Sequence, residues 1–284
     1  MKIKTAFYSL LFTPFILGTS IATAKTASPQ IVKFPSGKLT LGGELFLPEG
    51  KGPFPVILFN HGSAPKMINS HASAAIAPKF VKNGWAFFMP YRRGQGLSAD
   101  QGPYIMDEIK SARWTGWGKA AKKMVELHKT DHLSDQMAAL NWLQKQDFAK
   151  KNQIATVGNS FGGIQVVLGM ESGMKSGAYC AGINASGAAR SWDESDDLQA
   201  LMKKAVANAR APIFFFQAKN DYDLTPTKAL SAHMTKSGKT AKVKIYPEFG
   251  NSEKQGHSLA YAGVSIWFDD ALAFVNAHCK NTTN

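Results

Sequence analysis

Buried apolar segments alternate with amphipathic segments along most of this chain, and this alternation limits the possible folds more than any other feature. Continuous apolar runs cover residues 56–60, 85–93 and 211–220, as in strands buried on both faces of a parallel sheet. Helical patterns over residues 133–146 and 196–209 lie between such runs. Strands that alternate with helices predict an α/β fold, with an open, largely parallel sheet and helices on both faces.

The remaining elements follow the same rhythm. Residues 38–50 alternate apolar and polar side chains, which predicts a strand of an opening antiparallel hairpin. Further strands are predicted over residues 153–160, 180–186 and 241–247, and further helices over residues 70–84, 163–172, 225–238 and 258–279. Ser134 is the predicted N-cap of the helix over residues 133–146. Residues 94–130 form a long irregular excursion, and such segments are often functional or contain short helices of their own.

The first residues have the pattern of an export signal. Two lysines within the first four residues precede an apolar stretch over residues 6–18 and small residues at 22–24. We predict a signal peptide over residues 1–24, cleaved after Ala24, and a single α/β domain over residues 25–284 that is periplasmic or secreted. An uncleaved membrane anchor is the alternative, although the apolar stretch is short for a membrane span and contains a proline.

If the chain is exported, a disulfide between its two cysteines, Cys180 and Cys279, can persist, because the compartment is oxidising. The sequence leaves open whether these two residues are bridged. The formal net charge of +13 comes from scattered basic residues with no long basic run. This distribution indicates a solvated surface, so no nucleic-acid partner is predicted.

Ser160 lies in the motif G-x-S-x-G, between the strand predicted over residues 153–160 and the helix that follows it. Such a turn forces the serine into strained backbone angles, and a side chain at Gly158 or Gly162 would collide with neighbouring elements. The N-terminus of the following helix directs free N–H groups at an anion forming on this site. The placement of the motif favours a nucleophilic serine.

A serine hydroxyl needs a base, and in this kind of fold the acid and the histidine follow the serine in the chain. Asp221 lies just past the end of a buried apolar run and is the preferred acid. Asp223 is the rival, but it better suits an Asx turn or an N-cap before the helix over residues 225–238. His257 lies in a glycine-bearing loop between the last strand and the last helix, and it is the predicted base.

The apolar run over residues 56–60 leads into a segment that suits an oxyanion hole. The backbone N–H of Ser63 is one predicted donor, and the N–H of Phe161, directly after the nucleophile, is the other. His61 precedes Ser160 in the chain, which is the wrong order for the base. We therefore expect His61 to order this loop.

The remaining histidines are assigned no catalytic role. His128 and His132 are four residues apart, but they lie in a basic, polar segment and lack the glutamate of the H-E-x-x-H motif. Three further histidines fall in predicted helices and are expected to be structural, namely His71, His233 and His278. No metal and no organic cofactor is predicted.

Several segments together resemble the α/β-hydrolase superfamily, and more closely the dienelactone-hydrolase-like proteins and the catalytic domains of the prolyl-oligopeptidase group. The segments are FNHGS (59–63), YRRGQGLS (91–98), VGNSFGG (157–163) and the pair Asp221 and His257. The resemblance covers nearly all of the predicted mature chain, and it implies an eight-stranded sheet with a Ser160–Asp221–His257 triad. Dienelactone hydrolases themselves have a cysteine nucleophile, so the resemblance implies a related serine enzyme.

The sequence therefore predicts acyl transfer to water, by a serine hydrolase that cleaves small carboxylic esters through an acyl-enzyme intermediate. The alternatives are a serine peptidase or amidase acting on short peptides, and an exported, non-catalytic binding protein of the same fold. Four aromatic residues either roof a partly apolar pocket or pack beneath loops, namely Tyr104, Trp114, Trp117 and Trp192.

Overall fold

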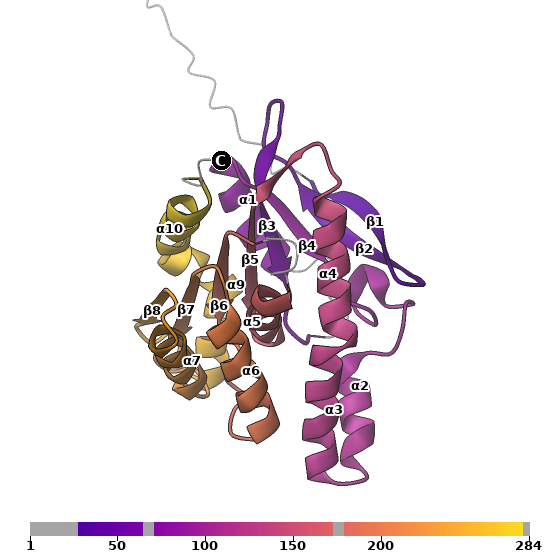
Figure 1. Ribbon diagram of the computed structural model, residues 1–284, viewed down its shortest axis with the longest axis vertical. Coiled ribbons are helices and arrows are strands. Elements are labelled where there is room, and N and C mark those ends of the chain that lie inside the picture. The colour runs from indigo at the N-terminus through magenta and orange to yellow at the C-terminus, as the bar shows by residue number, and fades with distance from the viewer. Residues whose placement is uncertain (1–27, 65–70, 173–178, 281–284) are drawn as a thin grey trace, which may run out of the picture.

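An eight-stranded sheet forms the centre of the computed structural model, which describes residues 28–64, 71–172 and 179–280 (Figure 1). In order across the sheet, the strands are β1 (Gln30–Ser36), β2 (Leu39–Phe46), β4 (Ala86–Pro90), β3 (Phe54–Asn60), β5 (Ala149–Asn159), β6 (Ala181–Ala185), β7 (Ile213–Ala218) and β8 (Ala241–Tyr246). β2 pairs antiparallel with β1 and β4, and all other pairs are parallel. The predicted fold class is confirmed. The predicted signal peptide lies outside the described residues.

Helices cover both faces of the sheet. One face carries α1 (His71–Lys82), α9 (Leu259–Ala262) and α10 (Val264–Val275), and the other carries α4 (Asp131–Leu143), α5 (Phe161–Ser172), α6 (Asp196–Asn208) and α7 (Thr225–Lys236). Short elements complete the chain, namely η1 (Gly96–Ser98), α2 (Ile105–Arg113), α3 (Trp117–Lys129) and α8 (Glu253–His257). Two hydrophobic cores therefore lie on opposite sides of one sheet.

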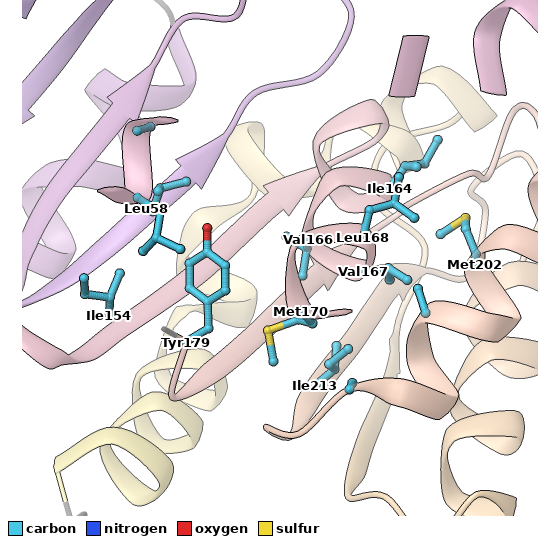
Figure 2. Close-up of a cluster of buried hydrophobic side chains, with 14 of the residues drawn as sticks. Leu58, Ile154, Ile164, Val166, Val167, Leu168, Met170, Tyr179, Met202 and Ile213 are labelled. Carbon is cyan, nitrogen blue, oxygen red and sulfur yellow. The ribbon is translucent and has the colours of Figure 1, made fainter. Parts of the chain in front are cut away.

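The central strands are apolar throughout because each supplies both cores. Along β3, Leu58 points into the core beneath α5, whereas Ile57 and Phe59 point into the core beneath α1. Figure 2 shows Leu58 together with Val166 and other side chains of α5 in the first of these cores. Full burial of one such side chain stabilises the folded state by about 1.5–3 kcal/mol. The segments with continuous apolar runs therefore occupy the centre of the sheet.

Two helix boundaries differ from the prediction. α4 begins at Asp131, so the N-cap predicted at Ser134 is wrong; Thr130 precedes the helix and makes no side-chain cap. The single closing helix predicted over residues 258–279 is also wrong, because Gly263 separates α9 from α10. A Cβ at Gly263 would come within 2.7 Å of Leu259 Cδ1, so that side chain would have to shift to admit another residue at this break.

The excursion over residues 94–130 contains short helices, as the prediction allowed. η1 is followed by α2 and α3, which lie side by side as a hairpin that extends away from the sheet (Figure 1). Each end of this hairpin returns to the carboxyl edge of the sheet, through Tyr104 before α2 and His128 near the end of α3. The excursion therefore contacts the edge at which ligands bind in such folds.

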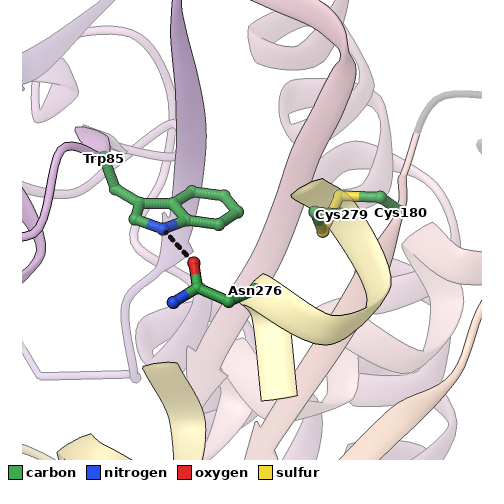
Figure 3. The surroundings of a disulfide bond; sticks show 4 residues. All are labelled: Trp85, Cys180, Asn276 and Cys279. Carbon is green, nitrogen blue, oxygen red and sulfur yellow. Dashed lines mark hydrogen bonds between the residues drawn. A yellow bond between two sulfur atoms is a disulfide. The ribbon is translucent and has the colours of Figure 1, made fainter. Parts of the chain in front are cut away.

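A disulfide joins Cys180, at the start of β6, to Cys279 in the π-helical turn Asn276–Lys280 that ends the described chain (Figure 3). Trp85 Nε1 donates a hydrogen bond of 3.1 Å to Asn276 Oδ1 in the same turn. These contacts fix the C-terminal helix to the sheet, and they answer the pairing question that the sequence left open. Within the described residues, no helix combines the length and the apolar character needed to cross a membrane.

Candidate active site

Ser160 occupies the sharp turn between β5 and α5. Its φ of 56° lies in the left-handed region, which is uncommon for a residue with a side chain. A Cβ at Gly158 would approach the backbone oxygen of Gly162 to 2.3 Å, and one at Gly162 would approach the oxygen of Asn60 to 1.9 Å. Both glycines are therefore required by backbone crowding, as the motif predicts. The Ser160 N–H donates to the oxygen of Ala185 on β6, 3.0 Å away, which fixes the turn against the sheet.

His257 and Asp221 lie next to this serine, although they come from distant parts of the chain. His257 Nε2 is 3.0 Å from Ser160 Oγ, and His257 Nδ1 is 2.8 Å from Asp221 Oδ1. The side chain of Asp221 is fully buried, whereas that of His257 is 15% exposed. The structure thus brings the predicted nucleophile, base and acid into one continuous line of hydrogen-bonding atoms, with the acid at the inner end.

The loop that carries His257 is tied to the loop that carries Asp221. Asn220 Oδ1 accepts a hydrogen bond from the N–H of Phe249, and Asn220 Nδ2 donates to the oxygens of Phe249 and Ser252, each 3.2 Å away. A Cβ at Gly256 would approach the backbone oxygen of Asn220 to 2.6 Å. The glycine before the histidine therefore lets the two loops touch. His257 itself ends the short helix α8, so the sequence placed it correctly in the chain but missed its helical turn.

Asp221 is held as a carboxylate by its neighbours. Its Oδ1 accepts from His257 Nδ1 and from the N–H of Tyr222, and its Oδ2 accepts from Gln217 Nε2 at 2.9 Å. Burial acts to raise the pKa of Asp221, but hydrogen bonds from His257, Ser186 and Gln217 outweigh it and hold the pKa below the usual value of 3.8. An ionised Asp221 accepts a hydrogen bond from Nδ1–H and so keeps the proton on that nitrogen, which leaves Nε2 free to accept from the serine.

Asp223, the rival acid, faces away from this chemistry. Its Oδ1 accepts a hydrogen bond of 2.7 Å from the N–H of Thr225, the first residue of α7. This is the Asx turn that the sequence favoured for Asp223. Of the two candidate acids, Asp221 is therefore the one that contacts His257.

The two predicted oxyanion donors flank the serine. Phe161 is the first residue of α5, so its N–H has no acceptor within the helix. The loop of Gly62 and Ser63 runs directly beside the nucleophile, since a Cβ at Gly62 would lie 3.6 Å from Ser160 Cβ. Among the described residues, the N–H of Ser63 donates to no protein group. Within the part of the chain that the structure describes, both N–H groups are thus without a protein acceptor, and both belong to segments that adjoin Ser160, where a negatively charged tetrahedral oxygen would form.

Comparison with known proteins agrees with this geometry. A family model described as the dienelactone hydrolase family matches residues 41–261, which contain every site residue named above. The chain belongs to the dienelactone hydrolase family. No curated protein matches it.

Solved structures show how widely the fold of this family member is shared. An acylaminoacyl peptidase from Pyrococcus horikoshii is similar with a TM-score of 0.65 at 18% identity, over 92% of this chain but only 43% of the peptidase. The esterase Pf2001 from Pyrococcus furiosus has a TM-score of 0.63 at 12% identity, covering 88% of this chain and 93% of that one. Est1E from Butyrivibrio proteoclasticus, solved with ferulic acid, has a TM-score of 0.59 at 16% identity, with coverage of 85% and 99%. At such identities the likeness shows the fold alone.

Sequence reasoning missed the surroundings of His128 and His132. The segment that looked basic and polar is buried at both positions, with exposures of 0% and 2%. Burial and the charge of Arg92 lower the pKa of His128 to about 3 and lower that of His132 well below 6.5. The His128 ring also packs at 4.6 Å, edge to face, against Phe161. These histidines are therefore neutral packing groups directly behind the nucleophile turn.

The predicted aromatic roof is only partly present. The hydroxyl of Tyr104 donates to the backbone oxygen of Ser63, so this side chain does line the site. Trp114 is 84% exposed at the tip of the α2–α3 hairpin, and Trp192 is buried in the core beneath α5 and α6. Trp192 therefore agrees with the packing alternative, Trp114 agrees with neither alternative, and the side chain of Trp117 lies outside the described part of the structure.

Proposed function

We propose that this dienelactone hydrolase family member is a serine hydrolase that cleaves small carboxylic esters through a Ser160–Asp221–His257 triad. The observation that carries the proposal is the unbroken line from Ser160 Oγ through His257 to Asp221, with distances of 3.0 and 2.8 Å. Family membership supports hydrolysis in general. The ester preference rests on the sequence argument.

The reaction follows from the positions of these groups. His257 Nε2 takes the proton of Ser160 as its oxygen attacks the ester carbonyl, and the same nitrogen returns the proton to the leaving alcohol. Asp221 holds Nδ1–H and stabilises the imidazolium that forms between these two transfers. The N–H groups of Ser63 and Phe161 stabilise the oxyanion, and loss of one such donor typically costs on the order of 3 kcal/mol. Water then attacks the acyl-enzyme by the same route in reverse.

The test is hydrolysis of p-nitrophenyl esters of increasing acyl length by the purified protein and by Ser160→Ala, side by side. We expect turnover that falls by at least about 10⁴-fold in the variant, because the nucleophile is removed while the oxyanion donors remain. A parallel panel of short peptide amides distinguishes an esterase from an amidase. If the wild type hydrolyses no ester or amide and a fluorophosphonate does not label Ser160, the proposal is wrong and a non-catalytic binding role gains support.

We also propose that the chain is exported after cleavage of residues 1–24. The support is the charge and hydropathy pattern of that segment and the Cys180–Cys279 disulfide, since disulfides persist in oxidising compartments. The test is the intact mass and N-terminal sequence of protein recovered from the periplasm or medium. A mature chain starting at Lys25 supports export, and an intact Met1 with free thiols contradicts it.

A further inference from the structure

The loop that carries the oxyanion donor Ser63 is held from behind by an arginine that the sequence analysis assigned no role. Arg92 follows β4 and is 3% exposed. Its Nη2 donates to the backbone oxygen of Gly62 at 2.7 Å and more weakly to Gln95 Oε1 at 3.4 Å. Its backbone N–H donates to His61 Nε2 at 3.2 Å. Arg92 therefore donates hydrogen bonds to both His61 and Gly62 of the loop.

These contacts fix the protonation of His61. Because the N–H of Arg92 donates to Nε2, that nitrogen is the acceptor of the imidazole, and the proton of the neutral ring is on Nδ1. In this tautomer Nδ1 donates to the oxygen of Gly62, 2.8 Å away. Arg92 Nη2 lies 3.0 Å from the same Nδ1, and since both nitrogens are then donors, the Nη2 protons are directed at the Gly62 oxygen and not at the ring. Burial and the charge of Arg92 lower the pKa of His61 well below 6.5, which agrees with a neutral ring. The Gly62 oxygen thus accepts from His61 Nδ1 and from Arg92 Nη2 at the same time.

The orientation of one peptide group follows. Gly62 C=O and Ser63 N–H belong to the same peptide unit, which is trans, so the two bonds point in nearly opposite directions. Donors from Arg92 and His61, with a weaker one from Gln95 Nε2 at 3.5 Å, hold the carbonyl toward these side chains, and the N–H consequently points to the other side of the loop. The hydroxyl of Tyr104 holds the next carbonyl, that of Ser63. The peptide cannot rotate without breaking hydrogen bonds to buried groups.

We propose that Arg92 is a positioning residue that, together with His61, locks the Gly62–Ser63 peptide with its N–H aimed at the oxyanion. The inference rests on the proposed hydrolase function. Arg92 does not touch the substrate in this arrangement; it acts through the carbonyl of Gly62. The oxyanion donor is therefore preorganised before any substrate arrives, which is the condition under which such donors are most effective.

The surroundings of Arg92 argue against a purely stabilising role. Its Nε and Nη1 have no hydrogen-bond partner among the described residues, and burial lowers its pKa to about 10. Its neighbour Arg93 is different, because it forms ion pairs with Asp131 at 3.0 Å and Asp135 at 2.7 Å. A buried guanidinium with unsatisfied donors is costly, so its retention is better explained by what it does to the loop. Arg93 supplies a matched control with a conventional structural role.

The test compares Arg92→Met and Arg92→Lys with Arg93→Lys, measuring kcat, KM and inhibition by a trifluoromethyl ketone that forms a tetrahedral adduct. We expect kcat of Arg92→Met to fall about 10- to 100-fold, a part of the loss seen when an oxyanion donor is deleted, with KM within about 2-fold. The Ki of the ketone rises in proportion to the fall in kcat/KM, and the pH profile is unchanged. Arg92→Lys recovers part of kcat. Arg93→Lys lowers the melting temperature and leaves kcat within about 2-fold.

A second pair of variants decides the matter if Arg92→Met does not fold. An asparagine at position 61 places its amide near the Nδ1 site and retains the donor to Gly62, whereas a glutamine reaches the Nε2 site and does not. We therefore expect His61→Asn to keep more of kcat than His61→Gln. Folded Arg92 variants with wild-type kcat, or equal kcat in the two His61 variants, overturn the inference while leaving the proposed function intact. An inactive wild type overturns the proposed function itself.

Discussion

Two flanks of Ser160 use histidine in opposite ways. The triad flank consists of His257 and Asp221, and the arginine flank consists of His61, Arg92, His128 and His132. On the triad flank a buried carboxylate lies 2.8 Å from the imidazole. On the arginine flank burial and the nearby guanidinium lower the pKa of every histidine, so that these rings stay neutral.

The difference shows that a histidine's role here depends on whether a carboxylate reaches it. Asp135, a buried carboxylate whose charge acts on Arg92, is already engaged by Arg93 and by the hydroxyl of Ser36. It leaves the histidines of that flank without an anion to stabilise their charged form. One flank can therefore carry a proton during a reaction, and the other provides rigid, uncharged packing behind the oxyanion loop.

The largest expected effect comes from removing the carboxylate of the triad flank. We expect Asp221→Asn to lower kcat by about 10⁴-fold, because the amide no longer holds the proton on His257 Nδ1. Asp223→Asn is the matched control: its side chain keeps an oxygen for the Thr225 N–H, and kcat should change by less than about 3-fold. Ester hydrolysis under saturating substrate measures both. Equal losses in the two variants would remove the distinction drawn between the flanks.

The arginine flank should determine how stability depends on pH. His61, His128 and His132 have folded pKa values below the unfolded value of about 6.5, so the unfolded chain binds more protons as the pH falls below that value. Each contributes stability that is complete above pH ~6.5 and is lost at about 1.4 kcal/mol per pH unit below it. We expect stability to fall as the pH drops below about 6.5, and His128, whose folded pKa is about 3, contributes about 1.4 kcal/mol per pH unit around pH 5; urea unfolding at several pH values measures the slope.

Substitution of one of these histidines sharpens that expectation. His128→Gln should reduce the slope around pH 5 by about 1.4 kcal/mol per pH unit, whatever its effect on absolute stability. Asp221, whose folded pKa is lowered, adds stability that is present above pH ~4 and lost below it. It therefore does not contribute to the slope around pH 5. An unchanged slope in His128→Gln would mean that this ring is protonated in the folded protein, and that the two flanks are not electrostatically different.

The glycine at position 162, in the turn between the flanks, should tolerate no side chain. We expect Gly162→Ala to destabilise the protein by about 3 kcal/mol, because the new methyl group would meet the backbone oxygens of Asn60 and His61. Gly118→Ala, in α3, has open space around the new methyl group and should be neutral or stabilising by up to about 1 kcal/mol. Thermal unfolding compares the two. A small effect at Gly162 would show that the turn can shift, so that backbone crowding does not fix the serine.

The triad flank was predictable from sequence because its signals are local. A strand, a sharp turn and a helix around Ser160 lie within one short segment, and Asp221 and His257 each follow a strand in the expected order. The arginine flank was not predictable from sequence, because the burial and the hydrogen bonds of its residues arise from contacts between distant segments. His128 is buried only because α3 folds back onto Phe161, and Arg92 matters only because the loop of Gly62 lies against it. Neither contact leaves a pattern in the neighbouring residues.

The smallest expected effect tests whether the α2–α3 hairpin contributes to the oxyanion loop. Tyr104 precedes α2, and its hydroxyl is the side-chain donor to the Ser63 oxygen among the described residues. Tyr104→Phe removes that donor and keeps the ring, so we expect a loss of about 1 kcal/mol in transition-state stabilisation, or about 5-fold in kcat/KM. The effect should be on kcat, because the hydroxyl holds the protein's own peptide and not the substrate. A rise in KM at constant kcat would instead place Tyr104 among the substrate-binding residues.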